Sequence, residues 1–464
     1  MLGQHYYIKN IKKSSKIFQT LALIILLVFV LPGCGNPFMR GIFKTFPELP
    51  APAIKVASIL LDEDDIFLID SVITDRSLTA TIFPANAADK SISWDTSNAE
   101  VADVTPAVGN SAKITAAGPG SAIITVTTAD GNFCASCKVN VYSPGSGGDG
   151  DPYSIYDAES LKKIADNLGP GVYYKLVTDI DLSSVPNWTP IGTSASGNQF
   201  SGDFNGDGHT ISGLVINTSA DYQGLFGYIG SGGSVENLCV SGNINSGSAQ
   251  YIGIIAGHNA GTIQNCYTLG DITCSQNIGG ITGVNTGTVK NCYTLGNITS
   301  TNDNAGGIVG DNGGTVQYCY ALGDIKGNSS STGGIVGKRS NGTIKNCVAL
   351  NKNVSLPNGT QVGRVVGQLT GSGADSCLDN NYAYFDMYIT ANGSMVSVPH
   401  PGVITEKHGG DIDGSSPDGG YNNRDFWEST IDFIFSPAIW EWNGRSGLPI
   451  LSCFPAGTQD HSFP

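Results

Sequence analysis

Residues 278–298 read IGGITGVNTGTVKNCYTLGNI, and this stretch decides the fold because close copies of it recur along the second half of the chain. The copies begin at positions 251, 305 and 332, where the chain reads YIGIIAGHNAGTIQNCYTLGDI, AGGIVGDNGGTVQYCYALGDI and TGGIVGKRSNGTIKNCVAL. Each unit has room for two or three short strands, which are too few to bury their own apolar face. The repeat therefore predicts the stacked coils of a parallel β-helix, about 4.8 Å apart.

A glycine that recurs once per unit marks the register of the coils, at successive spacings of 30, 26, 27, 27 and 30 residues. If the coils stack, like residues lie above like, and every repeated position forms a column along the solenoid axis. The repeats and the weaker copies around them predict a β-helix of about eight coils over 153–385. An amphipathic pattern at 157–168 predicts a short helix that caps its N-terminal end. The marking glycines are Gly227, Gly257, Gly283, Gly310, Gly337 and Gly367.

Upstream of the repeats, residues 55–142 contain short alternating runs that are separated by Gly, Pro, Asn and Asp. In one run, Leu78, Ala80 and Ile82 share a single face. Several such strands at close spacing predict an immunoglobulin-like β-sandwich. The fold class expected for the chain is therefore all-β, with this sandwich joined to the β-helix by a Gly/Ser/Pro/Asp-rich linker at 143–152.

The sandwich segment resembles the bacterial Ig-like domain of group 2, the type found in intimin and invasin. The resemblance rests on ATIFPANAADKSISWDTSNAEVADV at 80–104, GPGSAIITVTTADG at 118–131 and CKVNVY at 137–142. In that family the domain is a spacer or an adhesive module without catalysis. The resemblance implies that Trp94 is a core residue rather than a platform for a ligand.

The repeated coils resemble GLUG-motif units, here GLFG at 224–227 and GIVG at 307–310. The likeness extends over about 153–453, from YYKLVTDIDLS near its start to TIDFIFSPAIWEWNGRSGLPIL near its end. Such units occur in bacterial surface proteins, including a segment of streptococcal immunoglobulin-A peptidases outside their catalytic part. The resemblance therefore implies a surface protein and assigns no activity to it.

Residues 386–464 follow the last clear repeat and carry Trp427, Trp440 and Trp442. The open end of a solenoid is a sheet edge that has to be covered. We therefore interpret 386–464 as a C-terminal capping region and expect these tryptophans to cover the core. Binding of sugar by the same tryptophans is the alternative.

The N-terminus has the features of an export signal. Four lysines precede the apolar run LALIILLVFVL at 21–31, which is shorter than the roughly 20 residues of a membrane span. The run ends in Leu-Pro-Gly-Cys34, which resembles the bacterial lipobox. We therefore expect a lipoprotein signal peptide at 1–33, lipidation at Cys34 and a proline-rich tether at 34–54. An ordinary signal peptide with a chance cysteine is the alternative, and both interpretations predict export.

Composition excludes several classes of protein. The 464 residues include 24 Lys and Arg against 39 Asp and Glu, and a net charge of −15 argues against binding to nucleic acid. Charged residues make up 14% and hydrophobic residues 40%, which is too apolar for a disordered acidic chain. The 62 glycines follow no strict three-residue period, so the chain is not a collagen.

Four cysteines share one column of the predicted solenoid, and this column suggests metal or redox chemistry. A leucine takes the same place in an earlier coil, however, which favours an inward, apolar position where free cysteine acts as a small hydrophobe. A reduced core ladder, one or two disulfides, and a metal site therefore stay open as interpretations. Cys134 and Cys137 form a CxxC on a predicted strand, where they point to opposite faces, so we interpret them as structural. The column reads Leu238, Cys266, Cys292, Cys319, Cys347 and Asn381.

The columns on either side of the cysteines are rich in asparagine and tyrosine. Asparagine tolerates a left-handed turn and can hydrogen-bond to its own copies above and below, so Asn237, Asn265 and Asn291 predict a turn ladder that Tyr318 interrupts. The tyrosine column follows this turn, which resets the in/out alternation, so the tyrosines could face either way. If they face outward, they form a strip that binds sugar faces or protein. This ligand-binding aromatic strip consists of Tyr267, Tyr293 and Tyr320.

One stretch matches the start of a calcium loop, with Asp203, Asn205 and Asp207 in DFNGDG. The glutamate expected at the twelfth position is missing, because Leu214 stands there. The same stretch fits a β-turn of an early coil, so the turn is the favoured interpretation and calcium the alternative. We expect no cofactor and no resident metal.

Convergent carboxylates would be the sign of an enzyme on this scaffold. Asp271, Asn297 and Asp324 instead recur at one position of consecutive coils, each after a glycine. Repetition favours a turn role, because a catalytic pair needs two distinct environments to separate its pKa values. The histidines lack HExxH spacing, while a Ser-His-Asp site with distant members stays open. We assign no catalytic residue.

These features together favour a cell-surface lipoprotein that acts as an adhesin or a structural presentation module and not as an enzyme. We expect it to be exported, lipid-anchored to the bacterial cell membrane or outer membrane, and facing outward. Its expected partners are the membrane, through the N-terminal lipid, and a glycan or protein ligand. The alternative is a polysaccharide-degrading lyase or glycosidase, since β-helices host such enzymes.

Overall fold

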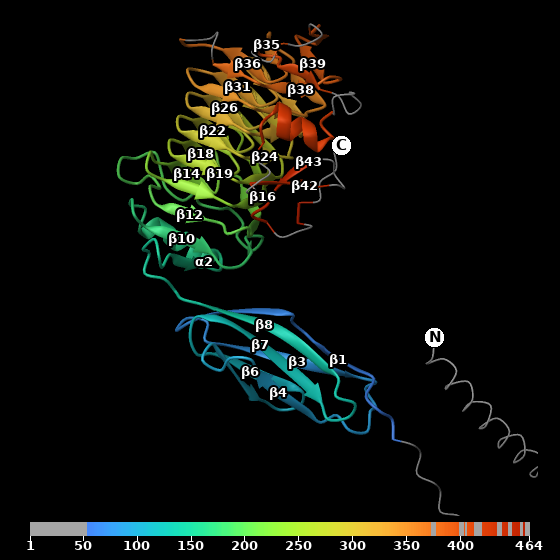
Figure 1. Cartoon of the computed structure of the whole chain (residues 1–464). Coiled ribbons are helices and arrows are strands. Elements are labelled where there is room, and N and C mark those ends of the chain that lie inside the picture. The colour runs from blue at the N-terminus through green and yellow to red at the C-terminus, as the bar shows by residue number, and fades with distance from the viewer. Residues whose placement is uncertain are drawn as a thin grey trace, which may run out of the picture.

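The structure, a computed structural model, is built almost entirely of strands, which form a β-sandwich followed by a β-solenoid of about eight turns (Figure 1). The all-β fold class that the sequence predicts is confirmed. The signal peptide at 1–33, Cys34 and most of the tether at 34–54 lie outside the described residues. The structure describes residues 53–372, 377–398, 403, 406–412, 420–433, 439–443, 448–454 and 458–459.

The sandwich consists of two four-stranded sheets packed face to face. Its strands are β1 (Ser58–Leu61), β2 (Asp65–Ile69), β3 (Asp75–Phe83), β4 (Ile92–Thr96), β5 (Ala102–Pro106), β6 (Ser111–Ala116), β7 (Gly120–Thr128) and β8 (Cys134–Tyr142). The strand orders are β1-β3-β6-β5 and β2-β8-β7-β4. Leu78, Ala80 and Ile82 of β3 are buried on one face, as the alternation predicts. Trp94 packs half-buried against both apolar clusters of the sandwich.

A short helical segment opens the solenoid, as predicted. It consists of α2 (Ala158–Lys163), which continues as one 3-10 turn, η3 (Ile164–Asp166). Asp157 begins it with a capping box, in which its carboxylate accepts from the backbone N–H of Ser160. The helical segment ends earlier than the predicted 157–168, before the Gly-Pro pair that follows it.

Three parallel sheets form the sides of the solenoid. The nine-stranded sheet contains β9 (Tyr153–Ile155), β10 (Tyr173–Leu176), β12 (Asp203–Asn205), β15 (Ser234–Glu236), β19 (Thr262–Gln264), β23 (Thr288–Lys290), β27 (Thr315–Gln317), β32 (Thr343–Lys345) and β37 (Leu378–Asp379). The six-stranded sheet contains β14 (Phe226–Ile229), β18 (Ala256–Asn259), β22 (Thr282–Asn285), β26 (Val309–Asn312), β31 (Val336–Arg339) and β36 (Val366–Leu369).

The third sheet has eighteen strands and is parallel except where β40 joins it. Its strands in the earlier coils are β11 (Ile180–Asp181), β13 (Thr210–Ile216), β16 (Cys239–Asn245), β17 (Gln250–Gly253), β20 (Tyr267–Leu269), β21 (Ile272–Gly279), β24 (Tyr293–Thr294), β25 (Ile298–Gly306) and β28 (Tyr320–Ala321). Those in the later coils are β29 (Ile325–Lys326), β30 (Ser331–Gly333), β33 (Val348–Ala349), β34 (Asn353–Leu356), β35 (Gln361–Gly363), β38 (Tyr382–Tyr384), β39 (Tyr388–Ala391), β40 (Ser394–Met395) and β41 (Gly410–Ile412).

The marking glycines line up along one axis, as the repeat predicts. Phe226 pairs with Ala256 and Tyr228 with His258, so Gly227 lies beside Gly257, and the same register continues to β36. A Cβ at Gly257 would lie 2.5 Å from the carbonyl carbon of Tyr222, which is closer than real Cβ contacts. Glycine recurs here because neighbouring backbones pass too closely for any side chain.

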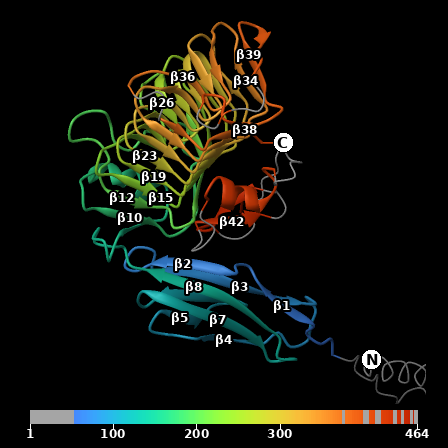
Figure 2. The same cartoon turned by 45° about the horizontal axis from the view of Figure 1, so that its top comes forward.

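Within the predicted capping region 386–464, β39, β40 and β41 continue the eighteen-stranded sheet at the last coils, whereas the later C-terminal segment packs elsewhere than predicted. Its described elements are the π-helical turn η5 (Phe426–Thr430) and the antiparallel pair β42 (Trp440–Asn443) and β43 (Leu448–Leu451). They lie along the side of the coils and not across the end of the stack (Figures 1 and 2). Trp427 and Trp440 are buried there against the tyrosine column. The physical reason is that the outward-facing aromatic rings of several coils give this segment a continuous apolar surface to bury.

Candidate functional site

The predicted aromatic strip faces outward from the solenoid core but is covered. Tyr267, Tyr293 and Tyr320 pair in register, and their rings stack at 4.8 Å with interplanar angles of 5° and 2°. All three side chains are buried, in a cluster separate from the main solenoid core. The sequence left open whether these rings face inward or outward. They point away from the solenoid core, but other parts of the chain bury them, so they are not accessible to a ligand.

The chain's own C-terminal segment occupies the strip. The hydroxyl of Tyr320 donates to the carbonyl oxygen of Pro449 at 2.6 Å, and that of Tyr293 donates to Oε1 of Gln459 at 2.7 Å. The ring of Phe454 stands edge-on to Tyr267. Burial raises the pKa of all three phenols well above the ordinary value. This corrects the expectation of an exposed ligand-binding strip, because internal packing already satisfies its faces and hydroxyls.

The cysteine column lies in the main core. Cys266, Cys292, Cys319 and Cys347 are all buried and all free. Each thiol donates to the carbonyl oxygen two residues earlier, at 3.0 to 3.2 Å. Burial raises the pKa of Cys266 and Cys319 well above the ordinary value, which keeps these thiols protonated. Of the three interpretations left open by the sequence, this geometry favours the reduced core ladder.

The asparagine turn ladder is confirmed. Asn237, Asn265 and Asn291 all have φ of 53°, in the left-handed region. Nδ2 of Asn265 donates to Oδ1 of Asn237, and Nδ2 of Asn291 to Oδ1 of Asn265, both at 3.0 Å. Tyr318 takes the same conformation at φ 55° and packs its ring on Phe433 of the C-terminal segment.

The repeated Asp and Asn positions cap turns. Oδ1 of Asp271 accepts from the backbone N–H of Asn297 at 2.8 Å, and Oδ1 of Asn297 accepts from the N–H of Asp324 at 3.0 Å. Each side chain thus holds the next coil in register. Their recurrence at the coil spacing makes these environments alike, which is the opposite of what an acid–base pair needs.

The calcium-like stretch also forms a turn. Oδ1 of Asn205 accepts from the N–H of Asp207 at 2.8 Å, and Asp207 pairs with Lys175 at 2.9 Å. Asp203 lies on β12, in the preceding strand. Within the described residues, no group of three His, Cys, Asp or Glu side chains is placed to hold a metal ion. Of the three candidate ligands, Asn205 and Asp207 thus bond within the turn and to Lys175, while Asp203 belongs to the strand before it.

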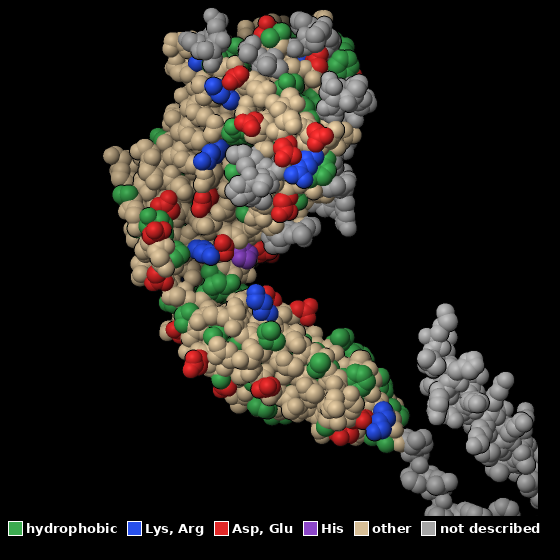
Figure 3. Space-filling view, in the orientation of Figure 1, with side chains coloured by type: hydrophobic (Ala, Val, Ile, Leu, Met, Phe, Trp, Pro, Cys, Tyr) green, Lys and Arg blue, Asp and Glu red, His purple; other side chains and the backbone are tan. Residues whose placement is uncertain are grey.

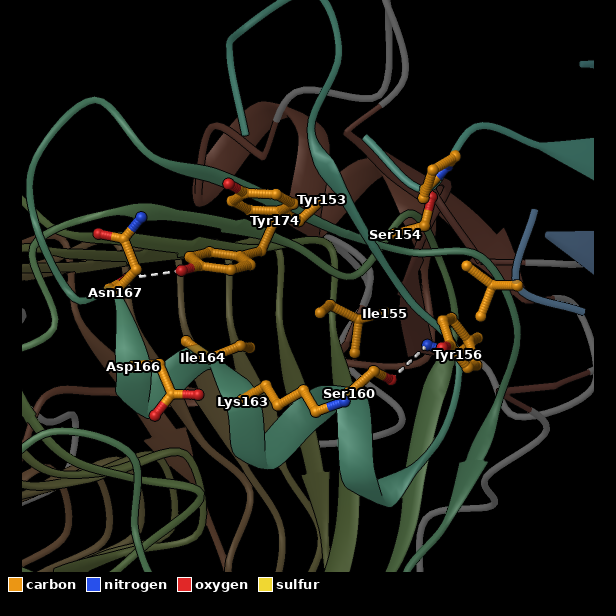
Figure 4. A pocket seen from close by; sticks show the side chains of 12 residues that line it. Tyr153, Ser154, Ile155, Tyr156, Ser160, Lys163, Ile164, Asp166, Asn167 and Tyr174 are labelled. Atoms are coloured by element: carbon orange, nitrogen blue, oxygen red, sulfur yellow. Dashed lines mark hydrogen bonds between the residues drawn. The ribbon is translucent and has the colours of Figure 1, made fainter. Parts of the chain in front are cut away.

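A cavity of about 330 Å³ lies where the sandwich meets the first coil (Figure 4). Val72 and Pro144 line one side of it, and the rings of Tyr153 and Tyr174 lie 5.7 Å apart on the other. The hydroxyl of Tyr174 already donates to the carbonyl oxygen of Asn167. The wall is mostly apolar and continuous with the solenoid core, so we interpret the cavity as the seam between the two domains.

A second group of aromatic side chains, which the sequence analysis missed, lies on β14 and β18 of the six-stranded sheet and on the segments that precede these two strands, including β17 of the eighteen-stranded sheet. We call Tyr222, Tyr228, Tyr251 and His258 the aromatic platform; all four are partly exposed. The rings of Tyr228 and His258 stack at 4.2 Å with an angle of 10°. The rings of Tyr222 and Tyr251 stack at 4.7 Å with an angle of 18°, and Tyr222 lies 6.1 Å from Tyr228. Two short ring stacks therefore stand side by side across two coils.

These rings meet because adjacent coils stack in register. Tyr228 pairs directly with His258 on β14 and β18. Tyr222 and Tyr251 precede the same strands in the left-handed region, at φ 59° and 66°, where the next coils carry Asn277 and Asn304. A bulky residue at positive φ is uncommon and costs about 1–3 kcal/mol, and such positions concentrate at functional sites. Tyrosines in a column that otherwise selects asparagine were the sequence signal for this site.

The platform carries no net charge at neutral pH. Burial lowers the pKa of His258 to about 4, so its imidazole is neutral, and Nε2 lies 3.1 Å from Oγ1 of Thr286. Desolvation raises the pKa of Tyr222 and Tyr228, which keeps both hydroxyls protonated. The site can therefore offer ring surface and neutral hydrogen-bonding groups.

Comparison with known proteins identifies the sandwich. Residues 74–139 match the bacterial Ig-like domain of group 2. The resemblance inferred from 80–104 and 118–131 is thereby confirmed for the Ig-like domain. Among the described residues, no helix has both the length and the apolar character needed to cross a bilayer.

Two curated relatives match shorter parts of the chain. A protein named as a Gly-rich membrane protein of Evansella cellulosilytica is 40% identical over 134 residues, which span 27% of this chain and 15% of that protein. Halomucin of Haloquadratum walsbyi is 35% identical over 140 residues, spanning 27% of this chain and 2% of its own length. The chain thus covers a small part of both relatives.

One solved structure resembles a larger part of the chain. It is a crystal structure described as an immunoglobulin A1 protease from Bacteroides ovatus, with 25% identity and a TM-score of 0.51. The match covers 67% of this chain and 95% of that one. The match supports the fold.

Proposed function

We propose that this chain is a non-catalytic module of the bacterial cell surface, in which the Ig-like domain acts as a spacer and the solenoid presents a binding face. The observation that carries the proposal is the use of the repeated polar side chains. Asp271, Asn297 and the asparagine ladder all bond to neighbouring coils, which makes the solenoid a scaffold. One partly exposed feature of this scaffold is the aromatic platform.

Several observations support a surface location. One relative is named as a Gly-rich membrane protein and the other as halomucin. The Ig-like domain matches a group that has spacer and adhesive members. The face seen in Figure 3 has acidic and basic side chains scattered over both domains, without a continuous basic footprint among the described residues. The proposal includes lipidation at Cys34, GLUG-type coils, and the membrane as a partner through the lipid.

The test compares binding with turnover. The full chain, kept in a detergent without a sugar headgroup, is incubated with intact bacterial cells, with cell-wall polymers and with a panel of soluble polysaccharides. We expect the chain to sediment with one or more surfaces and to release neither reducing ends nor unsaturated sugars. Catalytic release of product would overturn the proposal in favour of a lyase or glycosidase.

The location has its own test. Antibody against the Ig-like domain should label intact cells that express the chain, and Cys34→Ser should abolish metabolic labelling with a fatty acid. Labelling only after the cells are permeabilised would contradict a surface location. Unchanged fatty-acid incorporation in Cys34→Ser would contradict lipidation at this position.

A further inference from the structure

We propose that the aromatic platform is a binding site for a neutral polysaccharide, whose pyranose rings pack on the ends of its two ring stacks. This proposal rests on the proposed function, because it names the ligand of a binding face.

The two ring stacks of the platform end at Tyr251 and His258. In-register side chains on adjacent coils lie about 4.8 Å apart, so rings that stack across coils turn their faces along the solenoid axis. In the next coil the two columns continue with Asn277 and Val284, which carry no ring. Tyr251 and His258 are therefore the last rings, and each has a face that no further ring covers. Because Asn277 and Val284 are shorter than the aromatic side chains beside them, a sugar ring would pack on the outer part of each ring, beyond the side chain of the next coil.

The chemistry of the platform fits a sugar better than an ion. The apolar C–H face of a pyranose packs on an aromatic ring, and its hydroxyls need neutral donors and acceptors nearby. The three tyrosines of the platform are partly exposed. The neutral imidazole of His258 repels no ligand and attracts no anion.

The surroundings select against an acidic chain. Asp221 is exposed beside Tyr222, and its Oδ1 accepts from the N–H of Gln250. The nearest basic side chain of this column, Lys338, is already paired with Asp311 at 3.7 Å. With a net charge of −15 for the chain, a polyanion would meet repulsion that a neutral glycan does not.

The platform is partly exposed, unlike the tyrosine strip. The described C-terminal residues pack against Tyr267, Tyr293 and Tyr320 on the eighteen-stranded sheet. β14 and β18 lie on a different side of the coils, away from η5 and β42 (Figure 1). The coil before them joins β14 at Ile191 and Phe200, so the intervening loop borders the platform.

The repeat itself supplies a variant designed to fold. Tyr251→Asn and His258→Val put into this coil the residues that the next coil carries at the same two positions. Asparagine accepts the left-handed backbone that Tyr251 adopts, and valine suits a strand. The double variant should therefore keep the solenoid while removing both end rings.

The experiment measures binding of the full chain to chitohexaose, cellohexaose and a hyaluronan oligosaccharide by isothermal titration. We expect at least one neutral hexasaccharide to bind, hyaluronan to bind more weakly, and the double variant to lose about tenfold or more in Kd. Tyr251→Phe, which keeps the ring, should bind within about threefold of the wild type. Tyr388→Ala is the control, because this tyrosine is 49% exposed on β39 in a later coil.

Each outcome decides the proposal. It is overturned if the wild type binds no neutral hexasaccharide, if the double variant binds as well as the wild type, or if Tyr388→Ala loses as much affinity. Loss of the glycan site while the chain still sediments with cells would leave the proposed function standing. Turnover of a hexasaccharide, by contrast, would overturn the proposed function itself.

Discussion

Single residues hold the interior of the solenoid together by bonding to their own copies. Asn259, Asn285 and Asn312 are fully buried, and Nδ2 of each of the first two donates to Oδ1 of the next at 2.8 to 2.9 Å. Nδ2 of Asn285 also lies 3.1 Å from the carbonyl oxygen of Thr315. Each of these side-chain amides bonds to groups in the next coil. Removing one member of the ladder therefore also breaks hydrogen bonds of its neighbours.

We predict that Asn285→Ala lowers the free energy of unfolding by about 1–3 kcal/mol, because it removes one acceptor of the buried side-chain amide of Asn259 and the amide that donates to the buried Oδ1 of Asn312. Denaturant unfolding followed by circular dichroism measures the change. Asn358→Ala is the control: its amide is exposed and bonds to the exposed Asn328, so its loss should cost under about 1 kcal/mol. Equal effects of the two variants would contradict the role of the buried ladder.

Histidine burial predicts a pH dependence of stability. Burial lowers the pKa of both His258 and His408 to about 4, whereas an exposed histidine titrates near 6.5. Between these values the unfolded chain binds more protons, so stability should fall as pH decreases from about 6.5 to 4 and change little above that window. Unfolding midpoints from pH 4 to 8 measure it, and His258→Val should make the slope shallower. A slope that His258→Val leaves unchanged would exclude His258 as a contributor.

At the scale of elements, the coils depend on close backbone contacts and the C-terminal segment depends on aromatic packing. Gly283 lies on β22, in the middle of the six-stranded sheet, and a Cβ added to it would lie 2.3 Å from the backbone nitrogen of Ile252. Trp440, the first residue of β42, is 1% exposed, and its ring centroid lies 6.4 Å from that of Tyr293 and 5.9 Å from that of Tyr320. The first contact sets the stacking of coils, and the second fastens a separate segment to their side.

We predict that Gly283→Ala destabilises the solenoid by about 1–3 kcal/mol or more, because the added methyl group meets backbone that has no room to move. Thermal unfolding should show the loss as a lower Tm. Gly313→Ala is matched, since the nearest atom to its Cβ would be 3.7 Å away, and it should leave Tm almost unchanged. A Gly283→Ala protein as stable as Gly313→Ala would argue against the close stacking.

We predict that Trp440→Ala loosens the C-terminal segment by about 3–5 kcal/mol, since it removes a fully buried aromatic side chain. Hydrogen exchange should then increase in β42 and β43 while the coils stay protected. Trp442→Ala, which truncates a half-exposed neighbour, should change exchange little. Equal protection of β42 in Trp440→Ala and wild type would show that other contacts hold the segment.

At the scale of the whole molecule, one continuous core runs the length of the solenoid, from Ile155 to Ile389. The sandwich has its own apolar clusters, so the two parts are stabilised independently. In the solenoid, each coil is stabilised by packing against its neighbours. The four cysteines of the column lie in four successive coils of this common core.

We predict that the thiols of Cys266, Cys292, Cys319 and Cys347 become reactive together. Alkylation with mass spectrometry over a denaturant series, without reductant, should show all four protected in the folded chain and modified in the same transition. Exposed Cys134 should react at once and serves as the internal control. A need for reductant before the four thiols react would show disulfides in place of the reduced ladder.

The sequence by itself determined what depends on local repetition. Alternation predicted the buried face of β3, and the spacing of the glycines predicted the coil register that brings Gly257 beside Gly283. The turn roles of Asn265 and Asp271 also followed from recurrence, because a side chain that repeats in every coil meets its own copies. Such features need only near neighbours in a stack, and a period in the sequence specifies those neighbours.

Only the tertiary structure decided which outward-facing surface stays open. Tyr267 and Tyr293 were the visible aromatic column, yet a segment more than a hundred residues later covers them, through contacts such as Tyr293 with Gln459 that no period encodes. Tyr228 and His258 lie 30 residues apart in the chain and meet only because two coils stack in register. Exposure is set by what folds back over a surface, and that depends on long-range packing rather than on local pattern.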